Sequence, residues 1–80
     1  MKARVFIFYK ESVFDPQGNT LATSLRQNGF AQVKDVRVGK VIDVVVDSDS
    51  RDEVKREVAK MCERLFANPV IESYKFEIME

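Results

Sequence analysis

Side chains that commonly perform acid–base or nucleophilic chemistry are scarce in this sequence. It contains no histidine, so neither a Ser-His-Asp nor a Cys-His arrangement can be built within the chain. The one cysteine, Cys62, falls at helical spacing with Val58 and Leu65, which favours a buried structural thiol over a reactive one. We therefore expect no catalytic residue and no metal site in this chain.

Carboxylates and glycines are present, but their surroundings favour structural roles. The acidic residues between positions 51 and 64 are interleaved with lysines and arginines, as on a solvated helix surface. Asp43 and Asp47 flank a valine-rich segment, where a charge can guard against wrong strand pairing. Neither a P-loop nor a dinucleotide-binding glycine pattern occurs, and Gly39-Lys40 is interpreted as a turn rather than a phosphate site. We expect no cofactor-binding residue.

Charge and hydropathy argue against two classes of partner. Thirteen basic and thirteen acidic residues cancel and are spread along the chain, so no basic stripe for nucleic acid is indicated. No apolar run approaches the roughly 20 residues of a membrane span, and the first residues form an alternating strand pattern rather than a signal peptide. We expect a cytoplasmic protein without membrane association.

The small size of the chain makes stability its main physical problem. Its 80 residues form one domain, 1–80, and a single core of this size rarely supplies more than about 3 to 5 kcal/mol. Disulfides, metals and oligomerisation are the usual remedies. One cysteine and no histidine remove the first two, so oligomerisation remains.

The first half of the chain predicts a strand followed by a helix. Residues 4–10 are rich in β-branched and aromatic types, which favour strands. Asp15 is placed to cap a helix that begins at Pro16 and ends before Gly29. Gly18 in the first turn of this helix is unfavourable and suggests a close backbone approach. The inner face of the helix is formed by Leu21, Ala22 and Leu25.

The second half predicts two strands, a helix and a last strand. Residues 33–38 and 41–47 are β-rich and are joined by Gly39-Lys40, a connection typical of an antiparallel hairpin. A capping box, Ser50-Arg51-Asp52-Glu53, opens a helix that ends at Asn68-Pro69. Its apolar face consists of Val54, Val58, Met61, Cys62 and Leu65. The last strand, 70–79, places Tyr74, Phe76 and Ile78 on one face.

The element order βαββαβ predicts an α+β, ferredoxin-like two-layer sandwich with a four-stranded, mainly antiparallel sheet and two helices on one face. Helices on one side leave the other face of the sheet open, yet apolar side chains point to both faces of strands 4–10 and 41–47. We therefore expect copies of the chain to pair through their sheets as a dimer or tetramer. The candidate contacts between copies are Phe6, Phe8, Val44 and Val46.

Three blocks of sequence show a common pattern. They are Phe14-Asp15-Pro16-Gln17-Gly18, Val36-Arg37-Val38-Gly39-Lys40, and Cys62 to Leu65 leading into Ala67-Asn68-Pro69-Val70-Ile71-Glu72-Ser73-Tyr74. In order, spacing and total length they resemble the PurS family, the small subunits of phosphoribosylformylglycinamidine (FGAM) synthase. The sequence departs from that pattern at Tyr9-Lys10 and Phe66, which affects packing details.

The resemblance implies a non-catalytic PurS-like subunit of an enzyme of de novo purine biosynthesis. That enzyme is an ATP-dependent amidoligase, which uses glutamine to convert formylglycinamide ribonucleotide to formylglycinamidine ribonucleotide. A PurQ-type glutaminase subunit would release ammonia, a PurL-type synthetase subunit would use ATP and Mg, and the PurS-like oligomer would bridge them and support ammonia transfer. The implied candidates for contacts with these partners are Asp15, Arg37, Gly39, Lys40, Asn68 and Glu72.

A purely structural role is the alternative for several of these residues. Asp15 would then be only a helix cap, Gly39 only a turn residue, and Asn68-Pro69 only the end of a helix. Two other functions share the expected fold. One is a small oligomeric regulatory module that binds a metabolite between subunits. The other is an acylphosphatase-like enzyme, but its anion-binding loop would fall at residues 11–15, which are acidic and lack arginine.

Overall fold

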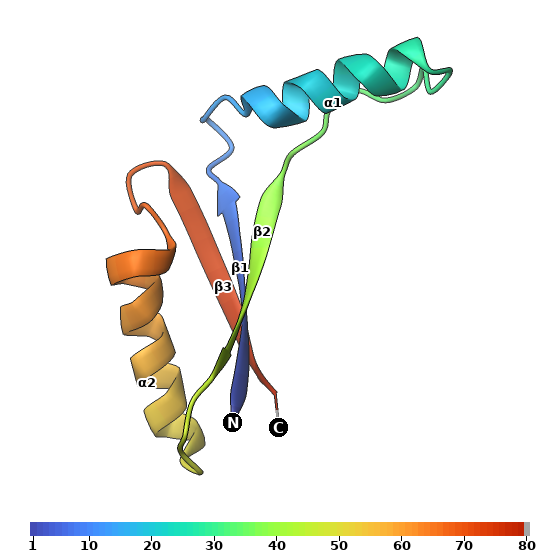
Figure 1. The fold of residues 1–80 in the computed structure, drawn as a ribbon. Helices are drawn as coiled ribbons and strands as arrows, with labels where there is room; N and C mark the ends of the chain where they lie inside the picture. The colour runs from blue at the N-terminus through green and yellow to red at the C-terminus, as the bar shows by residue number, and fades with distance from the viewer. Residues whose placement is uncertain (80) are drawn as a thin grey trace.

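The computed structural model describes residues 1–79, which form three strands and two helices (Figure 1). The elements are β1 (Lys2–Tyr9), α1 (Pro16–Gln27), β2 (Gly39–Val45), α2 (Arg51–Met61), the π-helical turn η1 (Cys62–Phe66) and β3 (Glu72–Met79). The fold is α+β, and both expected helices are present. Within residues 1–79, no helix is long and apolar enough to cross a membrane.

The sheet has three strands in the order β2-β1-β3, and both pairings are antiparallel. The expectation of four strands is wrong for the single chain. Residues 33–38 are extended but pair with no strand, and Gly39 and Lys40 lie inside β2, opposite Phe8 and Ile7. The chain therefore runs straight from 33–38 into β2, and the expected hairpin between these segments does not form.

Only α2 covers the sheet, so the expectation of two helices on one face is also wrong for the single chain. Side chains from alternate positions of β1 meet one face of α2, as strand and helix periodicity require. The fully buried core consists of Ala3, Val5, Ile7, Val54, Val58 and Cys62. Tyr74, Phe76 and Ile78 of β3 pack against this core from the same face of the sheet, as predicted.

The first helix projects away from the sheet together with the segment that follows it (Figure 1). We call residues 11–38 the arm. In the arm, residues 33–38 return alongside α1 towards the sheet, and Arg26 Nη1 donates to the Val33 carbonyl at 3.0 Å. The Cα radius of gyration is 16.1 Å, whereas a compact chain of this length has about 12 Å. The elongated shape leaves Leu21, on the expected inner face of α1, 44% exposed.

The ends of α1 follow the sequence signals. Asp15 is its N-cap and Pro16 its first residue, so the missing N–H of proline costs no hydrogen bond. After the helix, Gly29 adopts φ +98°, a left-handed conformation that favours glycine. Phe30 N donates to the Leu25 carbonyl at 3.0 Å, which turns the chain back along the helix.

A π-helical turn follows α2 and changes which side chains face the sheet. Ala67 N donates to the Cys62 carbonyl at 2.9 Å, five residues earlier, so the turn contains one extra residue. Phe66 and Ala67 therefore pack against the core, whereas Leu65 is 83% exposed. The expected place of Leu65 on the buried face is wrong because the sequence pattern assumed an uninterrupted α-helix.

Candidate subunit interface

The root of the arm, where two chain segments leave the sheet side by side, contains two of the matched sequence blocks. Asp15 lies between these segments and is only 3% exposed. Its Oδ1 accepts from Gly18 N at 2.8 Å, and its Oδ2 accepts from Val38 N at 2.7 Å. The hydrogen bonds from Val38 and Gly18 lower the pKa of the Asp15 carboxyl from its ordinary value of 3.8. One carboxylate thus caps α1 and holds the returning segment.

Arg37 makes a second connection at the root. Its guanidinium donates to the Lys10 carbonyl at 3.0 Å and to the Val13 carbonyl at 2.7 Å. Lys10 N in turn donates to the Ile71 carbonyl at 2.9 Å, so Lys10 is tied to the start of β3. Arg37 therefore fastens the returning segment of the arm to the end of the sheet.

Two glycines allow the close packing of backbone at the root. A Cβ atom on Gly18 would overlap the Val36 carbonyl oxygen, so the helix can approach the returning segment only with glycine at this position. A Cβ atom on Gly39 would lie 2.8 Å from the Ile7 carbonyl oxygen across the β1–β2 ladder. The close approach expected at Gly18 is thus confirmed, and Gly39 serves a strand pairing instead of a turn.

A shallow hollow of about 350 Å³ lies where the arm meets the sheet. Its polar lining includes Asp15, Gln17, Lys40 and Glu72, and Tyr9 and Phe8 supply aromatic surface. Both carboxylate oxygens of Asp15 are already occupied by backbone donors. The exposed Lys40 ammonium is therefore the group of this hollow best placed to meet a negatively charged partner surface.

The loop between η1 and β3 places Asn68 and Glu72 together. Glu72 Oε1 accepts from Asn68 N at 2.7 Å, and Glu72 N donates to the Asn68 carbonyl at 2.7 Å. Asn68 Oδ1 also accepts from Val70 N at 3.1 Å, as in an Asx turn. These two candidate contact residues stabilise a tight loop, and Val70 at its tip is 77% exposed.

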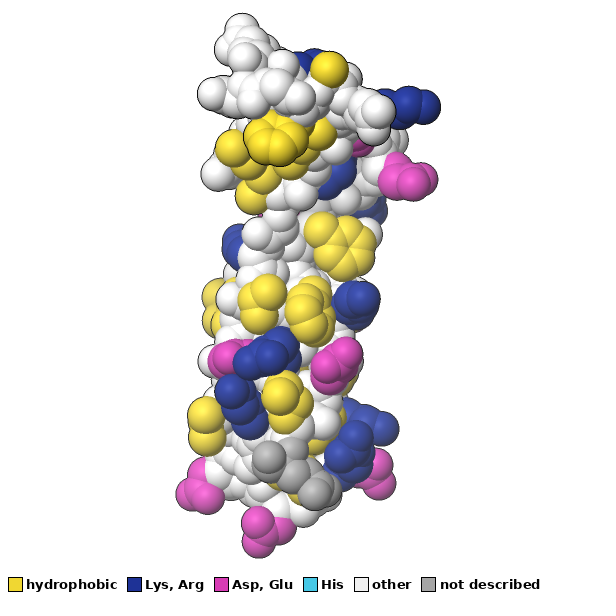
Figure 2. Space-filling model, turned by 90° about the vertical axis from the view of Figure 1, so that its right-hand side faces the viewer, with side chains coloured by type: hydrophobic (Ala, Val, Ile, Leu, Met, Phe, Trp, Pro, Cys, Tyr) yellow, Lys and Arg dark blue, Asp and Glu magenta, His cyan; other side chains and the backbone are white. Residues whose placement is uncertain are grey.

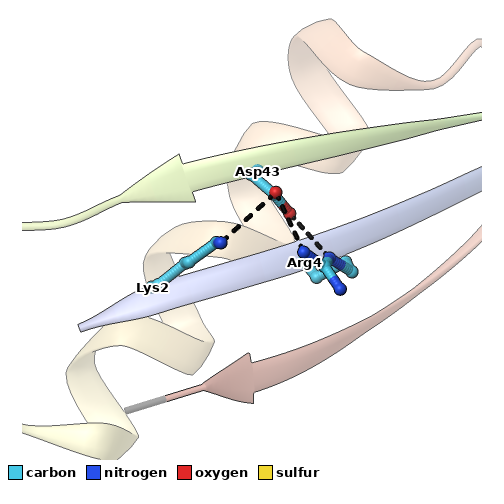
Figure 3. A network of polar contacts seen from close by, with 3 residues as sticks. All are labelled: Lys2, Arg4 and Asp43. Carbon is cyan, nitrogen blue, oxygen red and sulfur yellow. Dashed lines mark hydrogen bonds and ion pairs between the residues drawn. The ribbon is translucent and has the colours of Figure 1, made fainter.

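The open face of the sheet, opposite α2, carries charged and apolar side chains in alternating rows (Figure 2). Arg4 of β1 forms a bidentate pair with Asp43 of β2, with distances of 2.9 and 3.2 Å, and Lys2 Nζ lies 3.4 Å from the same carboxylate (Figure 3). The hydrogen bond from Arg4 and the nearby positive charges lower the pKa of Asp43. Because the network is half-exposed, it adds little to the stability of the chain. Its main effect is to align β1 with β2.

Apolar side chains on the open face come from positions that share the orientation of Phe6. Val41 lies opposite Phe6, and Val45, opposite Lys2, is 81% exposed. Lys75 Nζ lies 5.4 Å from the centre of the Phe6 ring and shields part of it. Phe8 is exposed one row further along. The open face of the isolated sheet is therefore apolar in patches separated by charge.

The candidate contacts Val44 and Val46 occupy a different part of the molecule from Phe6 and Phe8. Val44 lies opposite the buried Ala3, on the side of the sheet covered by α2. Val46 follows β2 and packs against the core. The open-face valines are instead Val41 and Val45, which the register identifies and the sequence alone did not single out.

The surroundings of the one cysteine disfavour its reactive form. Cys62 is buried in the core, and this burial raises the pKa of its thiol, which disfavours the thiolate. Within residues 1–79, no three His, Cys, Asp or Glu side chains are grouped to hold a metal ion.

An elongated α+β chain with a projecting arm and an open sheet face defines a class of small proteins that assemble with other chains. The sequence matches the family model described as "PurS: Phosphoribosylformylglycinamidine (FGAM) synthase" over residues 2–80. The chain belongs to the PurS family, whose members are small subunits of FGAM synthase.

Curated relatives and solved structures agree with this assignment along the whole chain. The PurS subunit of Archaeoglobus fulgidus is 47% identical over 74 residues, which are 92% of this chain and 92% of the relative. That of Bacillus subtilis is 40% identical over 79 residues, which are 99% of this chain and 93% of the relative.

Two solved structures extend the agreement to three dimensions. A Bacillus subtilis PurS structure is similar with a TM-score of 0.88 and 40% identity, covering 99% of this chain and 98% of its own. A chain in the PurLQS structure from Thermotoga maritima has a TM-score of 0.87 and 33% identity, covering 98% and 95%. The elongated single-chain shape is thus similar to that of solved PurS chains.

Proposed function

We propose that this chain is a bridging subunit of an FGAM synthase built from PurS-, PurL- and PurQ-type subunits, and that it performs no bond making or breaking itself. The observation that carries the proposal is the contrast between polar groups that form hydrogen bonds within the chain and apolar side chains that lie exposed. Asp15 and Arg37 form hydrogen bonds within the chain, whereas Leu21 and Phe30 of the arm and Val45 of the open sheet face lie exposed. ATP and Mg belong, in this proposal, to the PurL-type subunit.

The partner subunits follow from the relative in the Thermotoga maritima PurLQS structure, which covers nearly all of this chain. We assign Lys40 and the Asn68–Glu72 loop to contacts with the larger subunits, because Lys40 and residues 68–71 lie exposed at the end of the sheet from which the arm leaves. Bridging at this end would hold the glutaminase and synthetase subunits together during ammonia transfer.

A second copy of the chain completes the fold in this proposal. Residues 33–38 and 41–46 have the β-rich composition of a paired hairpin, but they form one continuous extended run in the single chain. Two antiparallel copies can restore the pairing between chains, with 33–38 of one copy beside 41–46 of the other. Each sheet would then have four strands and would receive α1 of the partner beside its own α2.

Exposure on the arm supports this exchange. Leu21 and Phe30 lie uncovered on a helix and turn whose apolar pattern requires a sheet beneath them. Ile42 and Val44, on the helix-covered face of β2, are only half-buried and leave room beside α2. Exchange between two copies buries both sets at once, which a chain of 80 residues needs for stability.

Two measurements test the proposal. Light scattering should give the mass of a dimer or a multiple of it, and a folded monomer at micromolar concentration would contradict the exchange. Co-purification with PurL- and PurQ-type subunits should recover a complex with glutamine-dependent activity, and Lys40→Ala should weaken that complex. Full activity of the two larger subunits without this chain would exclude the bridging role, and would favour a metabolite-binding module instead.

A further inference from the structure

At the root of the arm, Asp15 and Arg37 form hydrogen bonds that a contact with a second copy does not by itself require. We propose that Asp15 and Arg37 form a latch that keeps the arm open, and so directs the chain to pair with a second copy instead of closing on itself. This inference rests on the proposed exchange between copies. The two alternatives are pairing of residues 33–38 with β2 of the same chain and pairing with β2 of a second copy.

The alternative arrangement is the hairpin that the sequence pattern suggests. With Gly39 and Lys40 as a two-residue turn, Val38 and Val41 would form the first hydrogen-bonded pair, and the Val38 N–H would donate to the Val41 carbonyl. The arm would then fold back onto its own sheet. A closed monomer of this kind pairs the same runs as the exchanged dimer, but only the two-residue turn requires the pair of Val38 and Val41 beside it.

Asp15 removes the donor that the closed hairpin needs. Its Oδ2 accepts from Val38 N at 2.7 Å, so the first hydrogen bond of the hairpin cannot form while Asp15 holds this group. The carboxylate is nearly fully buried, and its other oxygen is held by Gly18 at the start of α1. A competitor fixed at both oxygens cannot simply rotate away from Val38.

Arg37, the residue before Val38, also favours the open position of the arm. It donates to the carbonyls of Lys10 and Val13, which belong to the outgoing connection between β1 and α1. The outgoing and returning connections are thereby tied together in extended form. Folding the arm back would have to break these bonds or move both connections.

Gly39 is also held in the open form. A two-residue hairpin requires a positive φ at its first turn residue. Gly39 instead lies in the ladder opposite Phe8, and among residues 1–79 only Gly29 has a positive φ. The residue that could form the turn is therefore used as strand, next to the Val38 N–H that Asp15 holds.

The decisive experiment separates the helix-capping bond of Asp15 to Gly18 from its hydrogen bond to Val38. Asp15→Ser keeps an N-cap oxygen for Gly18, since serine and aspartate cap helices about equally well, but the shorter side chain cannot also hold Val38. Arg37→Met removes the second connection while keeping much of the side-chain volume. Arg26→Met is the matched control, because Arg26 donates to Val33 within the arm and does not reach the sheet.

The measured quantity is the dimer dissociation constant, from sedimentation equilibrium, together with the radius of gyration of the monomer from X-ray scattering. Asp15→Ser loses one charge-assisted hydrogen bond and Arg37→Met loses two, so the dissociation constant should rise roughly 10-fold or more in each variant. The released monomer should approach the roughly 12 Å of a closed chain. Arg26→Met should dissociate like the wild type.

Three results would overturn the inference in distinguishable ways. A dimeric wild type whose Asp15→Ser and Arg37→Met variants dissociate no more readily refutes the latch and leaves the exchange intact. A monomeric wild type refutes the exchange and the latch together. Released monomers that stay as elongated as the single chain described above would show that these residues do not oppose closure. If Asp15→Ser does not fold, Arg37→Met decides alone.

Discussion

At the scale of single residues, Gly18 offers a direct test of packing at the arm root. Alanine is a better helix former than glycine by about 1 kcal/mol, so Gly18→Ala would be stabilising in an isolated helix. Here the added Cβ overlaps the Val36 carbonyl oxygen, which is backbone and cannot easily move. We expect Gly18→Ala to lower the unfolding free energy by about 1 to 3 kcal/mol, as measured by urea unfolding.

Asn19→Ala is the matched control for Gly18→Ala, because Asn19 is the next residue of α1 and is exposed. It should change the unfolding free energy by less than about 0.5 kcal/mol. Equal effects of the two substitutions would contradict the close approach of α1 to the returning segment.

Asp15 gives the chain a predictable acid sensitivity. Its pKa is lowered in the folded chain by the N–H groups of Val38 and Gly18, from an ordinary value of 3.8. A carboxyl with a lowered folded pKa adds stability above its unfolded pKa, and that contribution is lost as pH falls through the folded value. The stability difference between the wild type and Asp15→Asn should therefore be constant above about pH 5 and shrink below pH 3.8.

Urea unfolding at a fixed protein concentration, from pH 7 to pH 2, measures this difference. Asp43 also has a lowered pKa, but it is present in both proteins and cancels from the comparison. A difference that does not change with pH would mean that the Asp15 carboxylate is not held as described.

At the scale of elements, the π-helical turn after α2 decides which apolar side chain is structural. Phe66 packs against the core and Leu65 does not, although uninterrupted α-helical spacing favours Leu65. We expect Phe66→Ala to lower the unfolding free energy by about 2 to 4 kcal/mol, whereas Leu65→Ala changes it by less than about 0.5 kcal/mol. Thermal or urea unfolding of the two variants gives the comparison, and the reverse order would contradict the turn.

Local signals in the sequence predicted where the helices begin and end better than they predicted which strands pair. Asp15, Pro16 and Gly29 mark the ends of α1 through hydrogen bonds and dihedral angles that depend on a few neighbouring residues. The second helix begins at its expected cap, where Glu53 N donates to Ser50 Oγ at 3.3 Å. In contrast to a full capping box, Ser50 N donates to Ser48 Oγ at 3.1 Å and not to Glu53.

The parts that the sequence did not predict depend on competition between distant segments. A β-rich pair around Gly39-Lys40 specifies strands but not whether they pair within a chain or between chains. In the proposed latch, the choice depends on Asp15, 23 residues before Val38, and no local pattern reveals that Asp15 accepts from Val38 N. The open-face valines were also missed, because the face of a strand follows from its register, which a run of consecutive valines leaves undetermined.

At the scale of the whole molecule, two separate surfaces remain for association. The arm engages a second copy in the proposed exchange, and the open sheet face lies on the opposite side from α2 and stays uncovered by it. The charged network of Lys2, Arg4 and Asp43 lies on this face (Figure 3), with Arg4 and Asp43 in the row between Phe6 and Lys2 of β1. A face of this kind suits a contact between two preformed dimers better than the folding of a single dimer.

Substituting the open-face valines separates these two levels of assembly. In Val41→Lys/Val45→Lys, two ammonium groups replace apolar side chains of the open face, and burying them costs free energy if open faces pack together. We expect this double variant to remain a dimer at concentrations where the wild type associates further, as measured by light scattering across a dilution series. Val70→Lys is the matched control, since Val70 is 77% exposed, similar to Val45 at 81%, but lies in the loop before β3. Dissociation of the double variant to monomers would place the primary contact between copies on the open face and not on the arm.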